Sequence, residues 1–426
     1  MHSALPYATR VSLVSIVAAL VVSLAGAACG TELSSGDLVV ADFGLHSILK
    51  VDPTTGDRTI VTGSGVGSGP SLAQPRHIVV DRFGQIYVTN ADQYSRTVIR
   101  VDPVTGNRTT VSSDSVGSGD TFSAPFGLSL DGDDALLVTD LSQGAVYRVD
   151  KASGDRIIIS NASIGVGPAI DRPAAIALDA TGNLFVGDQD IDSIVQVDPV
   201  TGDRTVVSSS TVGTGPSFFA PWDAVPADAS SLYVSDPSLA ILKVDTATGN
   251  RQLVSSSSHG SGTDFTALRS IAQATPDSLA ATDDLLTGVL LVNIASGNRS
   301  ILADATHGSG TAFVHPDGIA TVGTLVLRGD YNDDGIVDAA DYTVWRDTLS
   351  QPIMAGSGAD GNANGVIDAG DYDVWKSQFS NAGSGSAAIV TAPEPSSVGL
   401  WLAALVAVGL SRTRGGLRRG LARRRP

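Results

Sequence analysis

The stretch that decides the fold is VDPTTGDR at residues 51–58, because the same phrase returns five times along the chain. Its copies occupy residues 101–108, 149–156, 197–204, 244–251 and, in degraded form, 292–299. Successive copies begin 47 to 50 residues apart. A fixed period of this length indicates a fold in which one structural unit is stacked or arranged radially.

Each repeated unit has the sequence pattern of β-strands. In the second unit, short runs rich in Val, Ile and Tyr lie at residues 77–81, 85–90, 97–102 and 108–112, with turn residues between them. The recurring Asp-Pro-x-Thr-Gly-Asp/Asn predicts a hairpin turn in which glycine supplies the left-handed backbone conformation. Four strands per unit, without helical periodicity, predict a β-propeller.

The two ends of the repeat region predict how the ring closes. Residues 36–40 begin a unit that lacks its innermost strand, and residues 315–322 supply one extra strand after the sixth hairpin. We therefore expect an all-β six-bladed propeller over residues 36–323, with no exposed sheet edge at the closure. The spacing and the run DATGNLFVGD at residues 179–188 resemble NHL-type six-bladed propellers. That family includes binding scaffolds, lyases and lactonases, so the resemblance implies a fold rather than a function.

Three further features recur from unit to unit. Each second strand ends in an acidic or amide residue: Asp42, Asn90, Asp140, Asp188, Asp236 and Asp283. We favour turn capping for these residues over an acidic ring on one face. An arginine follows each hairpin turn, and we expect it to form a weak surface ion pair with a nearby Asp. Glycine-rich stretches such as residues 63–69 precede a strand rather than a helix, so we interpret them as connectors between blades rather than phosphate loops.

Differences between the units point to a ligand site. The first residues of the six innermost strands are Arg76, Phe126, Ala174, Trp222, Arg269 and Asp317, with His77 and Asp223 beside two of them. All six strands start at one mouth of the propeller channel, so these aromatic and charged side chains converge. Such a set suits a small polar or sugar-like ligand. The alternative is irregular packing and solvation of an exposed rim.

Catalysis is the competing function for this mouth. Lactonases and lyases with related propellers typically use a Glu as metal ligand or base, and the blades here contain no Glu. An Asp or His77 could take that role, so a secreted hydrolase or lyase acting on polysaccharide or a lactone stays open as the alternative. A cysteine nucleophile is excluded, because the only cysteine is Cys29 near the N-terminus. We favour a non-catalytic propeller that binds a carbohydrate or a protein.

Two further segments have the spacing of calcium loops. Residues 330–341 and 360–371 place oxygen donors at positions 1, 3, 5, 9 and 12, a glycine at 6 and a backbone carbonyl at 7. The predicted ligands are Asp330, Asn332, Asp334, Ile336, Asp338 and Asp341 in the first loop, and Asp360, Asn362, Asn364, Val366, Asp368 and Asp371 in the second. Two Ca²⁺ ions are therefore expected. Short helices should follow at residues 342–349 and 372–379, sharing a core built on Trp345 and Trp375.

Duplicated loops with Asp at position 12 and no entering helix resemble type I dockerin, over residues 328–382. The resemblance implies an α-helical, EF-hand-like calcium unit, a link to polysaccharide catabolism and a cohesin partner. In dockerins, hydroxyl residues at loop positions 10 and 11 often contact cohesin, whereas this chain has Ala339 and Ala340, then Ala369 and Gly370. The resemblance to dockerin therefore implies calcium binding for this chain, but leaves cohesin binding in doubt. The alternatives are that the unit is a rigid spacer stabilised by calcium or that it binds another partner.

Both ends of the chain have the layout of sorting signals. Residues 1–28 combine Arg10, a short apolar run and an Ala-Gly-Ala site, which indicates a secretory signal peptide. A lipoprotein signal ending at Cys29 is the alternative. After a linker at residues 383–392, residues 393–426 read Pro-Glu-Pro, an apolar run and a basic end, and resemble the PEP-CTERM signal. That family implies exosortase as a processing partner and transient inner-membrane association. A retained tail anchor is the alternative, although the run is short.

Charge and composition narrow the cellular setting. The chain of 426 residues has a formal net charge of −17, and between the two terminal segments it carries 19 basic and 43 acidic side chains. An acidic body repels nucleic acid and attracts cations. A single cysteine rules out an intrachain disulfide. We expect an exported protein of the cell surface, outer membrane or extracellular matrix.

Overall fold

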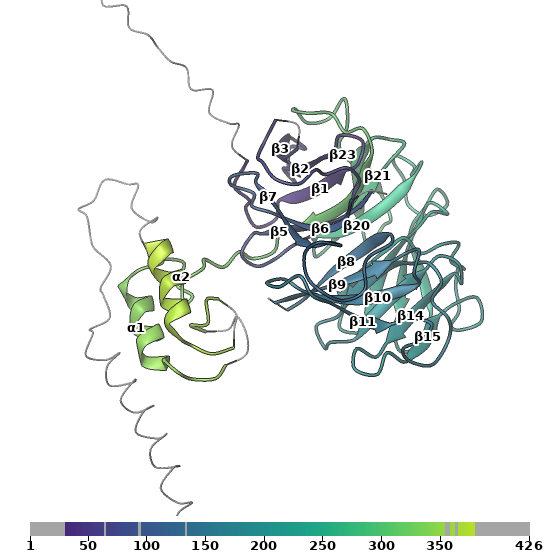
Figure 1. Ribbon diagram of the computed structural model, residues 1–426. Coiled ribbons are helices and arrows are strands. Elements are labelled where there is room, and N and C mark those ends of the chain that lie inside the picture. The colour runs from purple at the N-terminus through teal and green to yellow at the C-terminus, as the bar shows by residue number, and fades with distance from the viewer. Residues whose placement is uncertain are drawn as a thin grey trace, which may run out of the picture.

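The computed structural model describes residues 30–379, except residues 64, 93–94, 133, 354–357 and 363–364. Within these residues the chain forms 24 strands followed by two helices (Figure 1). The predictions for the signal peptide, Cys29, Asn364, the linker and the PEP-CTERM segment lie outside the described residues. No helix in the described part of the chain is both long and apolar enough to span a membrane.

The strands form six separate sheets of four antiparallel strands each. The first sheet contains β24 (Pro316–Thr321), β1 (Leu38–Asp42), β2 (Ser47–Val51) and β3 (Arg58–Thr62). The second contains β4 (Pro75–Val80), β5 (Ile86–Asp92), β6 (Ser95–Val101) and β7 (Arg108–Ser112). The third contains β8 (Pro125–Asp131), β9 (Ala135–Asp140), β10 (Ala145–Asp150) and β11 (Arg156–Ser160).

The remaining three sheets repeat this order. The fourth contains β12 (Pro173–Leu178), β13 (Leu184–Asp188), β14 (Ser193–Val197) and β15 (Arg204–Ser208). The fifth contains β16 (Asp223–Asp228), β17 (Ser231–Asp236), β18 (Ala240–Asp245) and β19 (Arg251–Ser255). The sixth contains β20 (Leu268–Thr275), β21 (Ser278–Asp283), β22 (Gly288–Asn293) and β23 (Arg299–Ala303).

The ring closes in the predicted way. The late strand β24 pairs with β1, with Leu38 opposite Thr321 and Val39 opposite Ala320. The innermost strands contact one another in the order β24, β4, β8, β12, β16, β20 and back to β24. The predicted all-β six-bladed propeller is therefore confirmed, and no innermost edge is left unpaired at the closure.

The repeated hairpin turn is built by hydrogen bonds from its own residues. The Asp52 carboxylate accepts from the backbone N–H groups of Thr54 and Thr55, at 2.8 and 2.9 Å. Gly56 has φ of 74°, and a Cβ on it would lie 2.0 Å from the Leu302 carbonyl oxygen of the adjacent blade. The turn therefore needs glycine both for its conformation and for the close approach of two backbones.

The core lies between neighbouring blades. One cluster joins Val39 and Ala41 of β1 to Ile86 and Val88 of β5, all of them fully buried. Equivalent clusters fill the other spaces between blades, as with Phe185 of β13 against Val234 of β17. Because each blade buries apolar side chains against its neighbours, the ring gains a continuous core without disulfides.

The prediction for the repeated arginines is wrong. Five of them, Arg58, Arg156, Arg204, Arg251 and Arg299, are buried, and Arg108 is partly buried. In all six, Nε donates to a carbonyl oxygen of a connector, namely that of Thr311, Pro70, Asp120, Pro168, Pro216 or Thr263. Of the six, only Arg299 forms an ion pair, with Asp264. The reason is that each connector turns its carbonyls toward the following hairpin, which also confirms the glycine-rich stretches as inter-blade connectors.

The two helices lie side by side (Figure 1). Both predicted tryptophans are buried in their shared core. They are α1 (Ala339–Thr348) and α2 (Ala369–Phe379), each beginning three residues before the predicted start. Trp345 Nε1 donates to the Asp368 carbonyl oxygen at 2.7 Å, and Trp375 Nε1 donates to that of Asp338 at 2.8 Å. Each helix is therefore fastened to the loop that precedes the other.

Candidate functional site: the channel mouth

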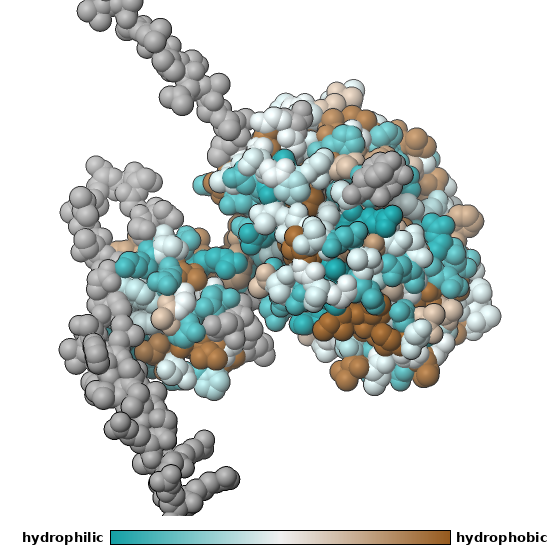
Figure 2. All heavy atoms as spheres, in the orientation of Figure 1, coloured by the Kyte–Doolittle hydropathy of each residue, from teal (hydrophilic) through white to brown (hydrophobic). Residues whose placement is uncertain are grey.

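A pocket of about 430 Å³ lies at the mouth where the innermost strands begin. Its walls are Phe43, Arg76, Trp222, Arg269, Asp284, His315, Pro316 and Asp317. Four of the predicted residues meet here, because each is at or beside the start of an innermost strand: Arg76, Trp222, Arg269 and Asp317. Figure 2 shows the surface of the molecule, on which polar residues predominate and apolar residues form separate patches.

Charged side chains of the pocket form two groups. Arg76 Nη1 donates to Asp317 Oδ2 at 2.7 Å. Arg269 Nη2 donates to Asp284 Oδ2 at 2.8 Å, and His315 Nδ1 lies 2.7 Å from Asp284 Oδ1. Burial alone would raise the pKa of Asp284, but hydrogen bonds and charges from Arg269 and His315 outweigh it and lower that pKa. Asp284 is therefore ionised at neutral pH.

Aromatic rings complete the pocket. The Arg269 guanidinium lies 4.5 Å from the Trp222 ring centroid, and that of Arg76 lies 4.6 Å from Phe43. Phe126 meets Trp222 edge to face at 5.3 Å. These cation–π and aromatic contacts fix the rings that a ligand would meet.

Two buried polar atoms in the mouth have no hydrogen-bond partner among the described residues. They are Asp317 Oδ1 and Trp222 Nε1. The Asp317 side chain is only 4% exposed, although its other oxygen is held by Arg76. A buried acceptor and a buried donor without partners are costly unless something binds them. The mouth therefore offers one acceptor and one donor to a bound molecule.

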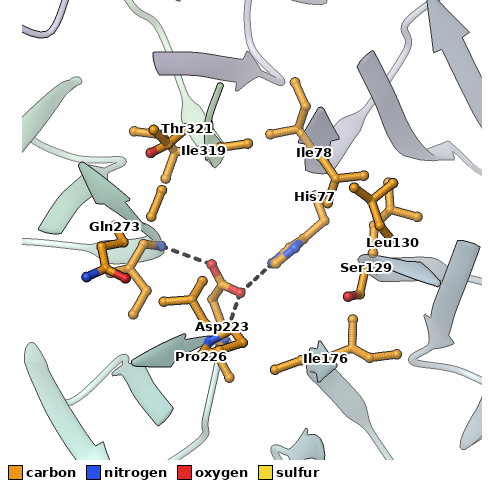
Figure 3. A pocket seen from close by; sticks show the side chains of 18 of the residues that line it. His77, Ile78, Ser129, Leu130, Ile176, Asp223, Pro226, Gln273, Ile319 and Thr321 are labelled. Carbon is orange, nitrogen blue, oxygen red and sulfur yellow. Dashed lines mark hydrogen bonds and ion pairs between the residues drawn. The ribbon is translucent and has the colours of Figure 1, made fainter. Parts of the chain in front are cut away.

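His77 and Asp223 lie one residue deeper along their strands and line the central channel rather than the mouth pocket (Figure 3). His77 Nε2 is 3.5 Å from Asp223 Oδ1, and the side chains are 6% and 4% exposed. Asp223 also accepts hydrogen bonds from the Ser270 hydroxyl and from the Ile271 N–H at 2.9 Å. Phe126, which contacts Trp222, lies 5.7 Å from His77. Ring contacts thus link His77 to Trp222 in the mouth.

Sequence reasoning missed four pocket residues, namely Phe43, Asp284, His315 and Pro316. Phe43 and Asp284 directly follow strand-ending aspartates, and His315 precedes the closing strand. Comparing the residue after each strand-ending Asp or Asn across the six units would have drawn attention to Phe43 and Asp284. Ala174, the smallest of the first-position residues, does not line the pocket.

The strand-ending aspartates themselves cap turns, as we favoured. Asp188 is fully buried and accepts from the N–H groups of Asp171, Arg172, Asp190 and Ile191 at 2.8 to 3.2 Å. Asp42, Asp140, Asp236 and Asp283 are equally buried and accept backbone hydrogen bonds in the same way. Their carboxylate oxygens accept hydrogen bonds from the backbone, so these residues form no acidic ring for a ligand.

The two predicted calcium loops fold around their own backbone N–H groups. Asp330 accepts from Gly335 N–H at 2.8 Å, and Asp360 accepts from Gly365 N–H at 2.7 Å. Burial raises the pKa of Asp341, although backbone hydrogen bonds oppose this, and the charge of Asp330 raises it further. In the described residues, which leave out Asn364, no group of three or more His, Cys, Asp or Glu side chains is arranged to hold a metal ion.

No known protein family and no curated protein matches this chain. Among solved structures, it is similar to a chain of a nidogen/laminin complex, at 15% identity and a TM-score of 0.52, over 68% of this chain and 99% of that one. It is also similar to virginiamycin B lyase from Staphylococcus aureus (12% identity, TM-score 0.46, covering 70% and 92%) and to a streptogramin B lyase (15%, 0.46, covering 69% and 87%). The likeness to the chain of the nidogen/laminin complex agrees with the six-bladed propeller fold.

Proposed function

We propose that this is an exported surface or matrix protein whose propeller binds a carbohydrate at the channel mouth without acting on it. The observation that carries the proposal is the 430 Å³ pocket in which Trp222 and Phe43 stand beside two Arg–Asp groups. Its size lies within the range of small-ligand sites, about 300–1,000 Å³.

Sugar chemistry matches the groups that the mouth leaves free. A sugar hydroxyl both donates and accepts, so it can satisfy Asp317 Oδ1 or Trp222 Nε1, which lack partners among the described residues. The apolar face of a pyranose ring packs against an aromatic ring, as it could against Trp222. Because each arginine is already paired with an aspartate, the pocket has no large excess charge that would demand a strongly charged ligand.

A glycan array probed with the mature protein tests this proposal. Binding to a defined glycan should fall at least about tenfold in Asp317→Asn, which keeps the side-chain volume but removes the charged acceptor. The matched control is Asp190→Asn, since Asp190 is half exposed and pairs only loosely with Arg172, at 3.7 Å. Unchanged glycan binding in Asp317→Asn, or an array without any specific signal, would contradict a carbohydrate site at the mouth.

Catalysis is the second candidate, and the buried His77–Asp223 pair is the observation that favours it. Two features weigh against it. The Ser270 hydroxyl donates to Asp223 rather than to His77, so a nucleophile–base pair is not formed. His77 also lines the central channel and not the mouth pocket. Turnover of a lactone or glycan panel that is abolished by both His77→Ala and Trp222→Ala would establish the enzyme instead.

We also propose that residues 330–341 and 360–371 bind two Ca²⁺ ions in a dockerin-like unit. Gly335 and Gly365 have φ of 84° and 79°, the left-handed conformation that position 6 of such a loop requires. The reciprocal tryptophan contacts tie the two loops into one unit. A role as a calcium-dependent spacer fits the alanines and glycine at positions 10 and 11 better than cohesin binding does.

Export and sorting complete the proposal. A signal peptide at residues 1–28 and a PEP-CTERM segment at residues 393–426 would make exosortase a processing partner and the inner membrane a transient location. Detecting the mature chain at the cell surface or in the matrix, with residues 393–426 removed, would support this route. Retention of the intact chain in the inner membrane would contradict it.

A further inference from the structure

The central channel holds a second cavity, of about 390 Å³, distinct from the mouth pocket. Its walls are mostly apolar, although Ser129, Gln273 and Thr321 also line it. One layer consists of the fourth residues of five innermost strands, namely Ile78, Leu128, Ile176, Ile271 and Ile319. Ile78, Ile176 and Ile319 are labelled in Figure 3. Burying a small apolar body against such walls is favourable because apolar surface is removed from water.

One end of this cavity is polar. There His77 Nε2 faces Asp223 Oδ1 at 3.5 Å, too far for a normal hydrogen bond. The Nε2 atom has no hydrogen-bond partner among the described residues, although His77 is only 4% exposed. Asp223 Oδ2 accepts hydrogen bonds from Ser270 and Ile271, and Asp223 Oδ1 accepts one from the Ala224 N–H at 2.7 Å. A carboxylate oxygen has two lone pairs, so Oδ1 can accept one further hydrogen bond. An unpartnered ring nitrogen and a carboxylate oxygen therefore stand together at the end of an apolar channel.

The corresponding positions of the other blades hold small side chains or none. They are Gly127, Ala175 and Gly318, besides Ser270. A Cβ on Gly318 would meet the Arg76 carbonyl oxygen at 2.1 Å, so the backbones are already close there. The polar end is thus confined to His77, Asp223 and Ser270.

We propose that the channel binds a small apolar alcohol or phenol, with its hydroxyl between His77 Nε2 and Asp223 Oδ1. A hydroxyl is a neutral group that can donate to the carboxylate while accepting from the imidazole N–H. A carboxylate ligand would be repelled by Asp223, and an ammonium group cannot accept from His77. The hydrocarbon body lies against the apolar layer of Ile78 and Ile176.

The probe pair 2-naphthol and 2-methoxynaphthalene tests this on the full mature chain by fluorescence titration. The two molecules share an apolar body, but the ether cannot donate to Asp223. We expect saturable binding of one naphthol per chain, with the ether about tenfold weaker or more. In His77→Phe, naphthol should bind no better than the ether, whereas His77→Gln should recover part of the difference.

Two further variants separate the channel from the mouth. Ala177, a buried channel residue, becomes bulky in Ala177→Phe, which should abolish binding of both probes. Arg269→Gln alters only the mouth and should leave naphthol binding unchanged while weakening any glycan. Thermal unfolding of each variant checks that the fold is intact.

Three results would overturn the inference: no saturable binding of naphthol, equal binding of naphthol and its ether, or binding that survives Ala177→Phe in a folded protein. The first would mean that the channel holds water only. The glycan array reports on the mouth alone. A failed naphthol titration therefore leaves the carbohydrate proposal intact, and a failed glycan array leaves the channel proposal intact.

Discussion

The hairpin rim and the channel mouth of the propeller are built from the same repeated unit, yet they differ in how their polar groups are used. At the rim, six arginines occupy equivalent positions and donate to equivalent carbonyls. At the mouth, the six equivalent positions hold five residue types, and Asp317 and Trp222 each have an atom without a hydrogen-bond partner among the described residues. A residue that repeats in every blade and has all its hydrogen bonds satisfied indicates a structural role. Positions that vary between blades and keep unsatisfied polar atoms indicate a binding role.

The largest effect should come from the rim. Arg204→Met removes hydrogen bonds to the partly buried carbonyls of Pro168, Asn161 and Ile164 and to the buried Ser160 hydroxyl, and leaves these acceptors without that donor. We expect a loss of about 3 kcal/mol in the free energy of unfolding, measured by urea denaturation. The control Arg172→Met, at a half-exposed arginine, should change it by less than about 0.5 kcal/mol. Similar losses of unfolding free energy in both variants would contradict a structural role for the rim arginines.

The helical unit extends the comparison, because it too repeats a contact, between each tryptophan and the opposite loop. Removing Ca²⁺ with EDTA should loosen both loops and expose Trp345 and Trp375, since uncompensated carboxylates repel one another. A red shift of tryptophan emission in a Trp222→Phe, Trp401→Phe background measures this. Asp330→Ala with Asp360→Ala should mimic EDTA, whereas Asp333→Ala, at a loop position that is not a predicted ligand, should not. A tryptophan emission maximum that does not change when EDTA is added would refute the calcium proposal.

A smaller, collective effect is expected from the hairpin aspartates. Hydrogen bonds from Thr55 and Thr54 lower the pKa of Asp52 below its ordinary value of 3.8, and turn hydrogen bonds likewise lower the pKa values of Asp150, Asp198 and Asp245. A lowered pKa in the folded state adds stability that is complete above pH 3.8 and lost as the pH falls below it. The thermal unfolding midpoint should therefore be flat from pH 8 to about 5 and drop below about 4.

A quadruple Asp→Asn variant of these turns sharpens that test. The sixth hairpin already uses Asn293, whose side-chain oxygen accepts from Ser296 N–H at 2.9 Å. The variant should therefore fold at neutral pH and lose less of its midpoint in acid. An acid profile identical to that of the unaltered protein would show that these turns do not govern it.

Most of the propeller could be predicted from sequence because its signals are local and repeated. The hairpin phrase gave the period, and the unmatched first unit gave the closing strand that the structure shows as β24. The tryptophan-centred helical core was likewise predicted from a short duplication. The arginine contacts were not predicted, because most of their partners are backbone carbonyls 35 to 43 residues away in five of the six blades. Nothing in the sequence marks which way a carbonyl points.

The mouth was predicted only in part for a related reason. Counting from the start of each innermost strand found Arg76, Trp222, Arg269 and Asp317, since strand position determines place along the channel. It could not distinguish the mouth from the layer one residue deeper, where His77 and Asp223 line a different cavity. Phe43, Asp284 and His315 enter the pocket from other strand ends, and only the closed ring brings them together.

The measurement that tests the central claim most directly is calorimetric titration of the strongest array glycan into the unaltered protein and into Trp222→Ala and Arg204→Met. If the mouth binds the ligand and the rim stabilises the fold, Trp222→Ala should lower the affinity for the glycan at least about tenfold, with little change in the urea midpoint. Arg204→Met should lower the midpoint but, while folded, bind the glycan normally. Normal glycan binding by folded Trp222→Ala would contradict the account.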